Sequence, residues 1–117
     1  MARAATTADV FNAIAEPRRR QIIDVLARGD EHAVQALVSM LRLPQPTVSK
    51  HLAVLLAVGI VAVTRRGRQR VYRLNAEELK PVHDWVKTYE HFWNSQLSRI
   101  KQRAERLARQ RAADAHS

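Results

Sequence analysis

The spacing of apolar residues along the chain predicts four short helices. Apolar positions recur at steps of three and four over residues 7–15, 17–28, 34–41 and 46–58, the period of a helix with one buried face. Prolines begin the second and fourth segments and a glycine follows each of them, as expected of helix ends. The residues expected to face the core are Val10, Phe11, Ile14, Ile22, Ile23, Val25, Leu26, Val34, Leu37, Val38, Leu41, Val48, Leu52, Leu55 and Leu56.

A basic hairpin is expected after the fourth helix. Residues 60–64, IVAVT, and 70–74, RVYRL, have the composition of two strands, and RRGRQ between them has that of a hairpin tip around Gly67. Asn75 is expected to cap a short turn that follows. The fold class is therefore mostly α with a small β-hairpin.

A long amphipathic helix is expected near the C-terminus, over about residues 82–108. Its apolar residues form one stripe, and both tryptophans lie within it. A chain this small cannot bury the whole stripe, so a second copy of the chain is the expected partner. A lid over the chain's own core is the alternative, but it accounts poorly for the last apolar positions. The stripe comprises Val82, Trp85, Val86, Tyr89, Phe92, Trp93, Leu97, Ile100, Ala104 and Leu107.

The length of 117 residues predicts one domain, over residues 1–111 with the long helix included, and a flexible tail over 112–117. The longest apolar run, 52–63, is too short to cross a bilayer, and the N-terminus lacks the apolar run of a signal peptide. No membrane association is expected, and the cytoplasm is the expected location.

The segment 43–52, LPQPTVSKHL, begins the fourth helix with short polar side chains. Pro46 suits a first helical turn, where a backbone N–H has no partner within the helix. Short hydrogen-bonding groups at such a position suit contacts with base edges in the DNA major groove. Capping or solvation explains any one of them equally well. The whole set, joined to the basic hairpin, favours base contacts: Gln45, Thr47, Ser49, Lys50 and His51.

Two groups of basic residues, His51 and the run 18–20, can each have either of two roles. His51 lies at the edge of the core face, so a packed histidine and a phosphate contact both stay open. The run 18–20, RRR, is expected to form a solvated face, with a phosphate contact as the alternative.

Charge along the chain is uneven. Lys and Arg total 20 against 11 Asp and Glu, a net charge of +9, and no acid lies between Glu31 and Glu77. A surface of one sign attracts polyanions, whereas a plain solvated surface usually mixes both signs. The seven cations in this interval are Arg42, Lys50, Arg65, Arg66, Arg68, Arg70 and Arg73.

Enzymatic functions are disfavoured. The chain has no cysteine, which excludes a thiol nucleophile and a cysteine-ligated metal, and its three glycines form no phosphate-binding loop. Ser49 and His51 are two positions apart on a helix and point in different directions. We expect no catalytic residues and no cofactor.

Three segments together resemble the ArsR/SmtB type of bacterial winged-helix repressor: EPRRRQIIDVLARG, LPQPTVSKHLAVLLAVGIV and TRRGRQRVYRL. The resemblance covers about residues 8–98 and implies a winged helix-turn-helix that is dimeric through its N- and C-terminal helices. The chain departs from the family pattern at Pro44, where a Ser cap is usual, and over 30–34, where a Thr-Val pair is usual.

The resemblance implies a transcriptional regulator, expected to be a repressor, that binds double-stranded DNA at an inverted repeat. Its candidate DNA-binding residues are Gln45, Thr47, Ser49, Lys50 and His51 on the recognition helix and Arg65, Arg66, Arg68 and Arg70 on the wing. Its candidate dimer interface comprises Phe11, Trp85, Tyr89, Phe92, Trp93, Leu97 and Ile100.

Two alternatives stay beside this function. A non-specific or architectural nucleic-acid binder would need only the arginines. A metal-responsive sensor would need histidine ligands on the last helix, but His83 and His91 are eight positions apart rather than four. We therefore expect no metal site, while an unidentified small-molecule effector stays open.

Overall fold

The computed structural model describes residues 6–115. Two helices joined by a tight turn begin the fold, α1 (Thr7–Ile14) and α2 (Pro17–Leu26). The Thr6 hydroxyl accepts a hydrogen bond from the Asp9 N–H, and the Asp9 carboxylate accepts one from the Thr6 N–H, so the first orphan donors of α1 are satisfied. Glu16 caps α2 in a similar way, because its carboxylate accepts the N–H groups of Arg18 and Arg19.

Helices α3 (Val34–Leu41) and α4 (Gln45–Ala57) form the helix-turn-helix. Arg42 makes the turn between them with a left-handed backbone, at φ 55° and ψ 43°. Pro44 then precedes α4 in an extended conformation, because its ring fixes φ at −59° and its ψ of 145° lies outside the helical range. All four helices predicted over residues 7–58 are present; α2 begins at Pro17 as predicted, and α4 begins at Gln45, one residue before Pro46.

Strands β2 (Val61–Arg66) and β3 (Gln69–Leu74) form the expected hairpin, and Gly67 makes its tip at φ +62°. The sheet differs from the prediction because it has a third strand. The two-residue strand β1 (His32–Ala33) pairs antiparallel with β3, which gives the order β1-β3-β2. A strand this short carries no periodic pattern, so only the pairing identifies it.

A 3-10 turn, η1 (Ala76–Leu79), follows the sheet. Asn75 stands at its N-cap position, as predicted, but its side chain makes no capping hydrogen bond there. The Asn75 side-chain amide instead donates to the Gly59 carbonyl at 3.2 Å, while its backbone N–H donates to the Ile60 carbonyl. These bonds tie the end of β3 to the turn between α4 and β2.

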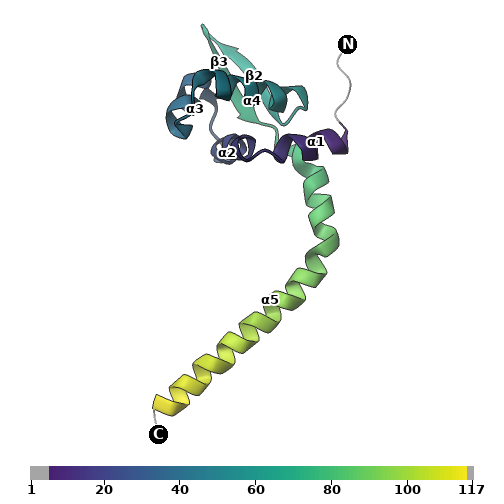
Figure 1. Ribbon diagram of the computed structural model, residues 1–117, viewed down its shortest axis with the longest axis vertical. Coiled ribbons are helices and arrows are strands. Elements are labelled where there is room, and N and C mark those ends of the chain that lie inside the picture. The colour runs from purple at the N-terminus through teal and green to yellow at the C-terminus, as the bar shows by residue number, and fades with distance from the viewer. Residues whose placement is uncertain (1–5, 116–117) are drawn as a thin grey trace. The chain divides into compact units, whose positions relative to one another are not determined.

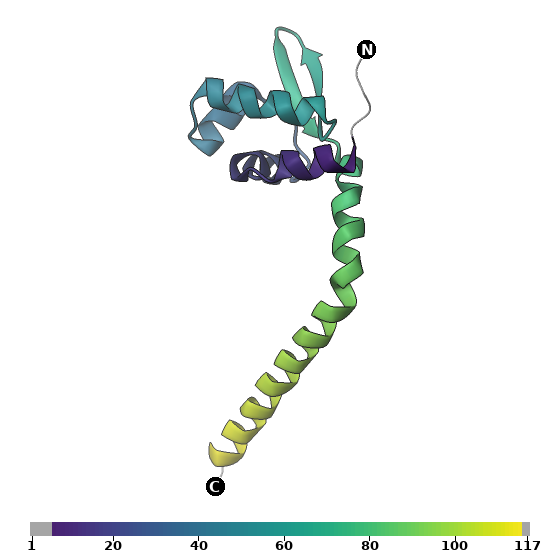
Figure 2. The same ribbon diagram turned by 45° about the vertical axis from the view of Figure 1, so that its right-hand side comes forward.

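The core lies between α1–α4 and the base of the sheet (Figures 1 and 2). Each fully buried Leu or Ile contributes about 1.5–3 kcal/mol on removal from water. The prediction was wrong at Leu56, which is 37% exposed, because α4 turns it about 100° away from Leu55. The buried residues are Val10, Ala13, Ile22, Ile23, Val25, Leu26, Leu37, Val48, Leu52, Leu55, Ile60, Val61 and Tyr72.

Helix α5 (Lys80–Ala115) runs from the end of η1, and residues from His83 onward form a separate compact unit. It begins before and ends after the segment of about 82–108 that the apolar stripe predicted. Residues 112–115, which belong to the predicted tail, are helical. Residues 116–117 lie outside the described part, and the flexibility of the tail stays a prediction. None of the helices over residues 6–115 is long and apolar enough to cross a membrane.

Candidate nucleic-acid interface

The first turns of α4 present polar side chains to solvent. Gln45, Ser49 and Lys50 are exposed, and Thr47 is half-buried. Val48 between them is fully buried, which fixes the rotation of the helix and leaves its polar face outward. Four of the five candidate recognition residues therefore lie within the first two turns of α4 with side chains at least partly in solvent, although Gln45 and Thr47 are about 200° apart around the helix.

Gln35 of α3 lies beside Gln45, a contact that no pattern in the sequence indicates. Its side-chain NH₂ donates to the Gln45 side-chain oxygen at 2.8 Å, across the two helices of the helix-turn-helix. This bond orients the Gln45 amide, whose NH₂ group stays available as a donor toward an acceptor atom such as purine N7. Two exposed glutamines on different elements carry no sequence signal, because their pairing depends on the angle between α3 and α4.

The backbone at the start of α4 is arranged by its two prolines. The Pro44 carbonyl accepts the N–H groups of Thr47 and Val48, both at 3.1 Å. Pro46 has no N–H, so it removes one of the donors that a helix start normally leaves unsatisfied. The recognition helix thus begins without the serine cap usual in the ArsR/SmtB type, and no side chain of the described residues caps it instead.

The His51 side chain is only 12% exposed and lies among charged groups of α2. Its Nε2 atom is 3.7 Å from the Glu16 carboxylate, and its Nδ1 atom is 3.4 Å from a guanidinium nitrogen of Arg19. Of the two alternatives that the sequence left open, this is the packed one. The side chain links α4 to the N-terminus of α2.

The arginines of α2 do more than form a solvated face, which corrects the expectation for residues 18–20. Arg19 donates to the carbonyls of Asn12 and Ala13, and Arg20 donates to those of Ile14 and Ala15. These carbonyls end α1, where a helix has unsatisfied acceptors and partial negative charge. Arg19 and Arg20 therefore close the C-terminus of α1, while Arg18 stays exposed.

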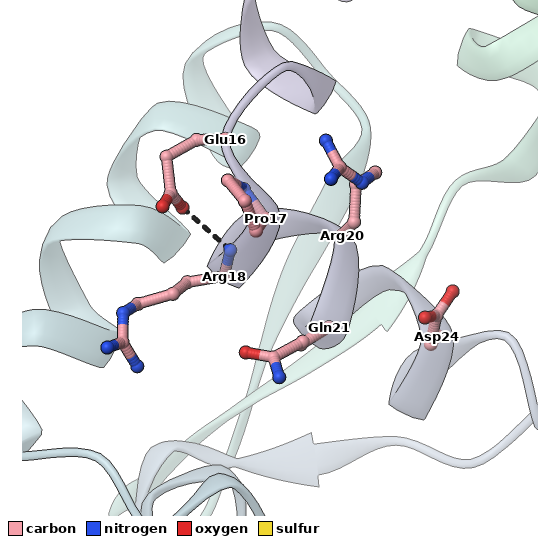
Figure 3. Close-up of a pocket in the computed structure, with 6 residues that line it drawn as sticks. All are labelled: Glu16, Pro17, Arg18, Arg20, Gln21 and Asp24. Carbon is pink, nitrogen blue, oxygen red and sulfur yellow. Dashed lines mark hydrogen bonds between the residues drawn. The ribbon is translucent and has the colours of Figure 1, made fainter.

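A shallow hollow at the start of α2 mixes both signs of charge (Figure 3). Arg18 and Arg20 extend to different sides of the helix, and the Glu16 carboxylate turns back to the Arg18 N–H. Asp24 supplies a second carboxylate. The balance of two cations and two anions gives this hollow no preference for a polyanion.

The wing has a second hollow with a single sign of charge. Val63 forms its apolar part, and Arg65, Arg68 and Arg70 line the rest. Arg65 and Arg70 are directly opposite each other in the β2–β3 ladder, and their pairing continues that of Val63 with Tyr72. The sheet thus gathers three of the four candidate wing arginines on one side of the hairpin.

Arg66 is on the other face of the hairpin, because successive residues of a strand alternate between faces. Its guanidinium forms an ion pair with the Glu31 carboxylate at 2.8 Å. Arg73 shares this face and donates to the Thr64 hydroxyl at 2.8 Å. The four wing arginines predicted as one group are therefore divided into three and one.

The candidate interface residues of α5 are exposed, whereas Val82 and Val86 of the same apolar stripe are partly buried. Trp85 and Tyr89 contact each other edge to face, with ring centroids 5.8 Å apart. Phe11 is half-buried on α1. The exposed fractions are 55% for Trp85, 46% for Tyr89, 62% for Phe92, 49% for Trp93, 62% for Leu97, 63% for Ile100 and 47% for Leu107.

Potential metal ligands do not gather within one copy of the chain. Across residues 6–115, no three His, Asp or Glu side chains lie close enough together to hold an ion. This observation concerns a single chain, so the expected absence of a metal site stays a prediction.

Comparison with known proteins places this geometry in a family. The family model described as "Bacterial regulatory protein, arsR family" matches residues 16–63, from the cap of α2 through the helix-turn-helix into β2. The transcriptional repressor SdpR of Bacillus subtilis is 32% identical over 78 residues, which are 67% of this chain and 86% of that protein. The chain belongs to the arsR family of bacterial regulatory proteins.

Two further proteins are similar over shorter parts. The HTH-type transcriptional repressor SmtB of Mycobacterium tuberculosis is 42% identical over 74 residues, which are 63% of this chain and 54% of that repressor. The homodimeric winged helix-turn-helix DNA-binding domain of Mb0332 from Mycobacterium bovis has a TM-score of 0.59 at 33% identity, and the match covers 72% of this chain and 77% of that domain.

Family and fold together define the class of protein. The chain is a winged helix-turn-helix transcriptional regulator that binds DNA, and it is not an enzyme.

Proposed function

We propose that the chain is a repressor that binds an inverted-repeat operator as a homodimer and acts in the cytoplasm, where bacterial DNA lies. The names of SmtB and SdpR support repression, and the homodimeric M. bovis domain supports the assembly. The observation that carries sequence specificity is the exposed polar start of α4, with Gln45, Ser49 and Lys50 around a buried Val48.

In this proposal the start of α4 enters the major groove. Gln45, oriented by Gln35, donates to a purine, while Thr47 and Ser49 contact base edges or a thymine methyl. Lys50 meets guanine or phosphate. His51 does not need to contact DNA, because its contacts with α2 hold the recognition helix in position.

The wing supplies affinity that does not depend on sequence. Arg65, Arg68 and Arg70 line one hollow in which no carboxylate takes part, so their charge is available to a phosphate or to the minor groove. Such interactions fix the register of the protein on the duplex, and the recognition helix then distinguishes one site from another.

The second copy packs on the terminal helices. The α5 residues of the candidate interface are about half or more exposed in one chain, and an aromatic stripe of this length is costly to leave in water. Phe11 of α1 is proposed to contact the second copy as well. Residues 1–111 then act as one DNA-binding domain that includes its dimerisation helix.

Selection of bound sequences from a pool of random duplexes tests this function. The expected product is an inverted repeat whose half-sites are about 34–36 Å apart, roughly one helical turn of DNA. If no sequence is enriched and the affinity for DNA falls steeply with salt, the protein would be an architectural DNA binder rather than a regulator. A single unrepeated half-site would contradict the two-fold dimer.

A further inference from the structure

Glu31 and Arg66 form the one ion pair that the wing makes with a carboxylate in the described part of the chain. The Arg66 Nη2 atom and the Glu31 Oε2 atom are 2.8 Å apart, which is the length of a charge-assisted hydrogen bond. The Glu31 side chain is 32% exposed and that of Arg66 is 65% exposed. The pair is therefore in contact with solvent and can be broken by a competing anion.

The position of Glu31 follows from the short strand β1. Glu31 directly precedes His32, and His32 pairs with Tyr72 of β3, so the carboxylate is tethered to the base of the wing. In the sequence, Glu31 is the last acid before Glu77, and all the wing cations lie between these two residues. One carboxylate is thus held by the sheet beside an otherwise cationic hairpin.

We propose that Glu31 limits the affinity of the regulator for DNA of any sequence by holding Arg66 out of the phosphate-binding set. A phosphate that approaches Arg66 must displace the carboxylate and is also repelled by it. Each wing then offers three cations to the duplex, from the hollow of Arg65, Arg68 and Arg70, rather than four. This role rests on the proposed DNA-binding surface.

Weak sequence-independent binding matters because a genome offers a large excess of non-specific sites. The affinity for those sites is almost entirely electrostatic, and it rises with each phosphate that the protein neutralises. A carboxylate that withholds one arginine lowers this background without touching the residues at the start of α4. Glu31 is in this sense a specificity-determining residue that contacts no base.

The test measures binding of a random-sequence duplex over a salt series by full-length wild-type protein and by Glu31→Gln. Glutamine keeps the shape of the side chain and removes its charge, which frees Arg66 for phosphate. The slope of log affinity against log salt should steepen by about 0.9 for each additional phosphate that the protein neutralises, or about 1.8 for a dimer. Asp30→Asn, next in sequence and equal in charge change, is the control and should leave the slope near that of the wild type.

Two more variants identify the partner of Glu31. The double variant Glu31→Gln/Arg66→Gln should return to the wild-type slope, because it removes a pair that neutralises no phosphate. Arg68→Gln should give a shallower slope than wild type, by about 0.9 for each phosphate that is no longer neutralised. All these side chains are exposed or partly exposed, so the variants are expected to fold.

An unchanged slope in Glu31→Gln would overturn the proposal. A double variant whose slope is as shallow as that of Arg68→Gln would also overturn it, because Arg66 would then already bind phosphate in the wild type. A wild-type protein that binds no duplex at all would contradict the proposed function itself, and is therefore distinct from both outcomes.

Discussion

Arg65 and Arg70 occupy directly opposite positions of the β2–β3 ladder, so two like charges form a cross-strand pair at the outer half of the wing. Such a pair lowers the stability of a hairpin, by a few tenths to about 1 kcal/mol relative to a favourable pair. Both residues line the same hollow with Arg68. The repulsion between Arg65 and Arg70 lowers the stability of the hairpin. A phosphate bound between the two cations would offset this repulsion, in agreement with the proposed role of the wing.

The Arg65–Arg70 pair predicts that stability and DNA affinity change in opposite directions. Arg70→Thr removes the repulsion and introduces a residue with good strand propensity, so the free energy of unfolding should rise by up to about 1 kcal/mol. Binding to operator and to random duplex should both weaken. Urea denaturation and a binding titration measure the two effects, and a variant with both lower stability and lower affinity would show that Arg70 is structural.

His51 is predicted to act through the position of α4 rather than through DNA contact. His51→Ala removes a 3.4 Å hydrogen bond with Arg19 and a longer contact with Glu16, and a net hydrogen bond is worth about 0.5–1.5 kcal/mol, so the free energy of unfolding should fall by about 1 kcal/mol. Lys50→Ala, its exposed neighbour, should leave stability unchanged. Thermal denaturation of both variants checks this, and equal stability of the two would return His51 to the DNA-contacting set.

Trp93 is predicted to lie in the dimer interface. Trp93→Asp places a charge in the apolar stripe of α5 and should yield monomers or insoluble protein. Asn94→Asp adds the same charge one residue along, about 100° around the helix, and should leave the dimer intact. Sedimentation at micromolar concentration separates the species, and a compact monomer for the wild-type chain would contradict the interface.

DNA binding is predicted to need no metal ion. The chain has no cysteine, and the histidines of the last helix, His83 and His91, are eight positions apart. Chelator-treated protein should bind its operator with unchanged affinity. An affinity change of about tenfold on addition of zinc, equivalent to about 1.4 kcal/mol, would contradict this if it disappears in His83→Ala or His91→Ala.

Local patterns in the sequence were sufficient to predict the helices and the β2–β3 hairpin, but not the short strand β1. Apolar periodicity located four helices, and Gly59 and Gly67 marked real turns, at φ +83° and φ +62°. The stripe from Val82 to Leu107 likewise predicted a long helix with exposed aromatic residues. These features depend on neighbours within a few positions, which is the range that a periodic pattern reports.

Pairs between distant elements could not be predicted in this way. Gln35 and Gln45 meet only because α3 and α4 cross at a given angle, and Glu31 reaches Arg66 only because β1 adds to the sheet. For the same reason, the sequence left open whether His51 packs against the core or contacts phosphate. Its partner Glu16 belongs to another helix, and no spacing rule relates the two.

The most direct test of a sequence-specific regulator compares Thr47→Ala with Arg68→Ala on operator and on random duplex over a salt series. Thr47→Ala should cost about 1–3 kcal/mol on the operator and little on random DNA, because the residue is proposed to contact a base. Arg68→Ala should weaken binding to both duplexes and flatten the salt dependence by about one unit for each phosphate that is no longer neutralised. The same uniform loss of affinity from both variants on both duplexes would show that α4 does not read sequence, and would contradict the account.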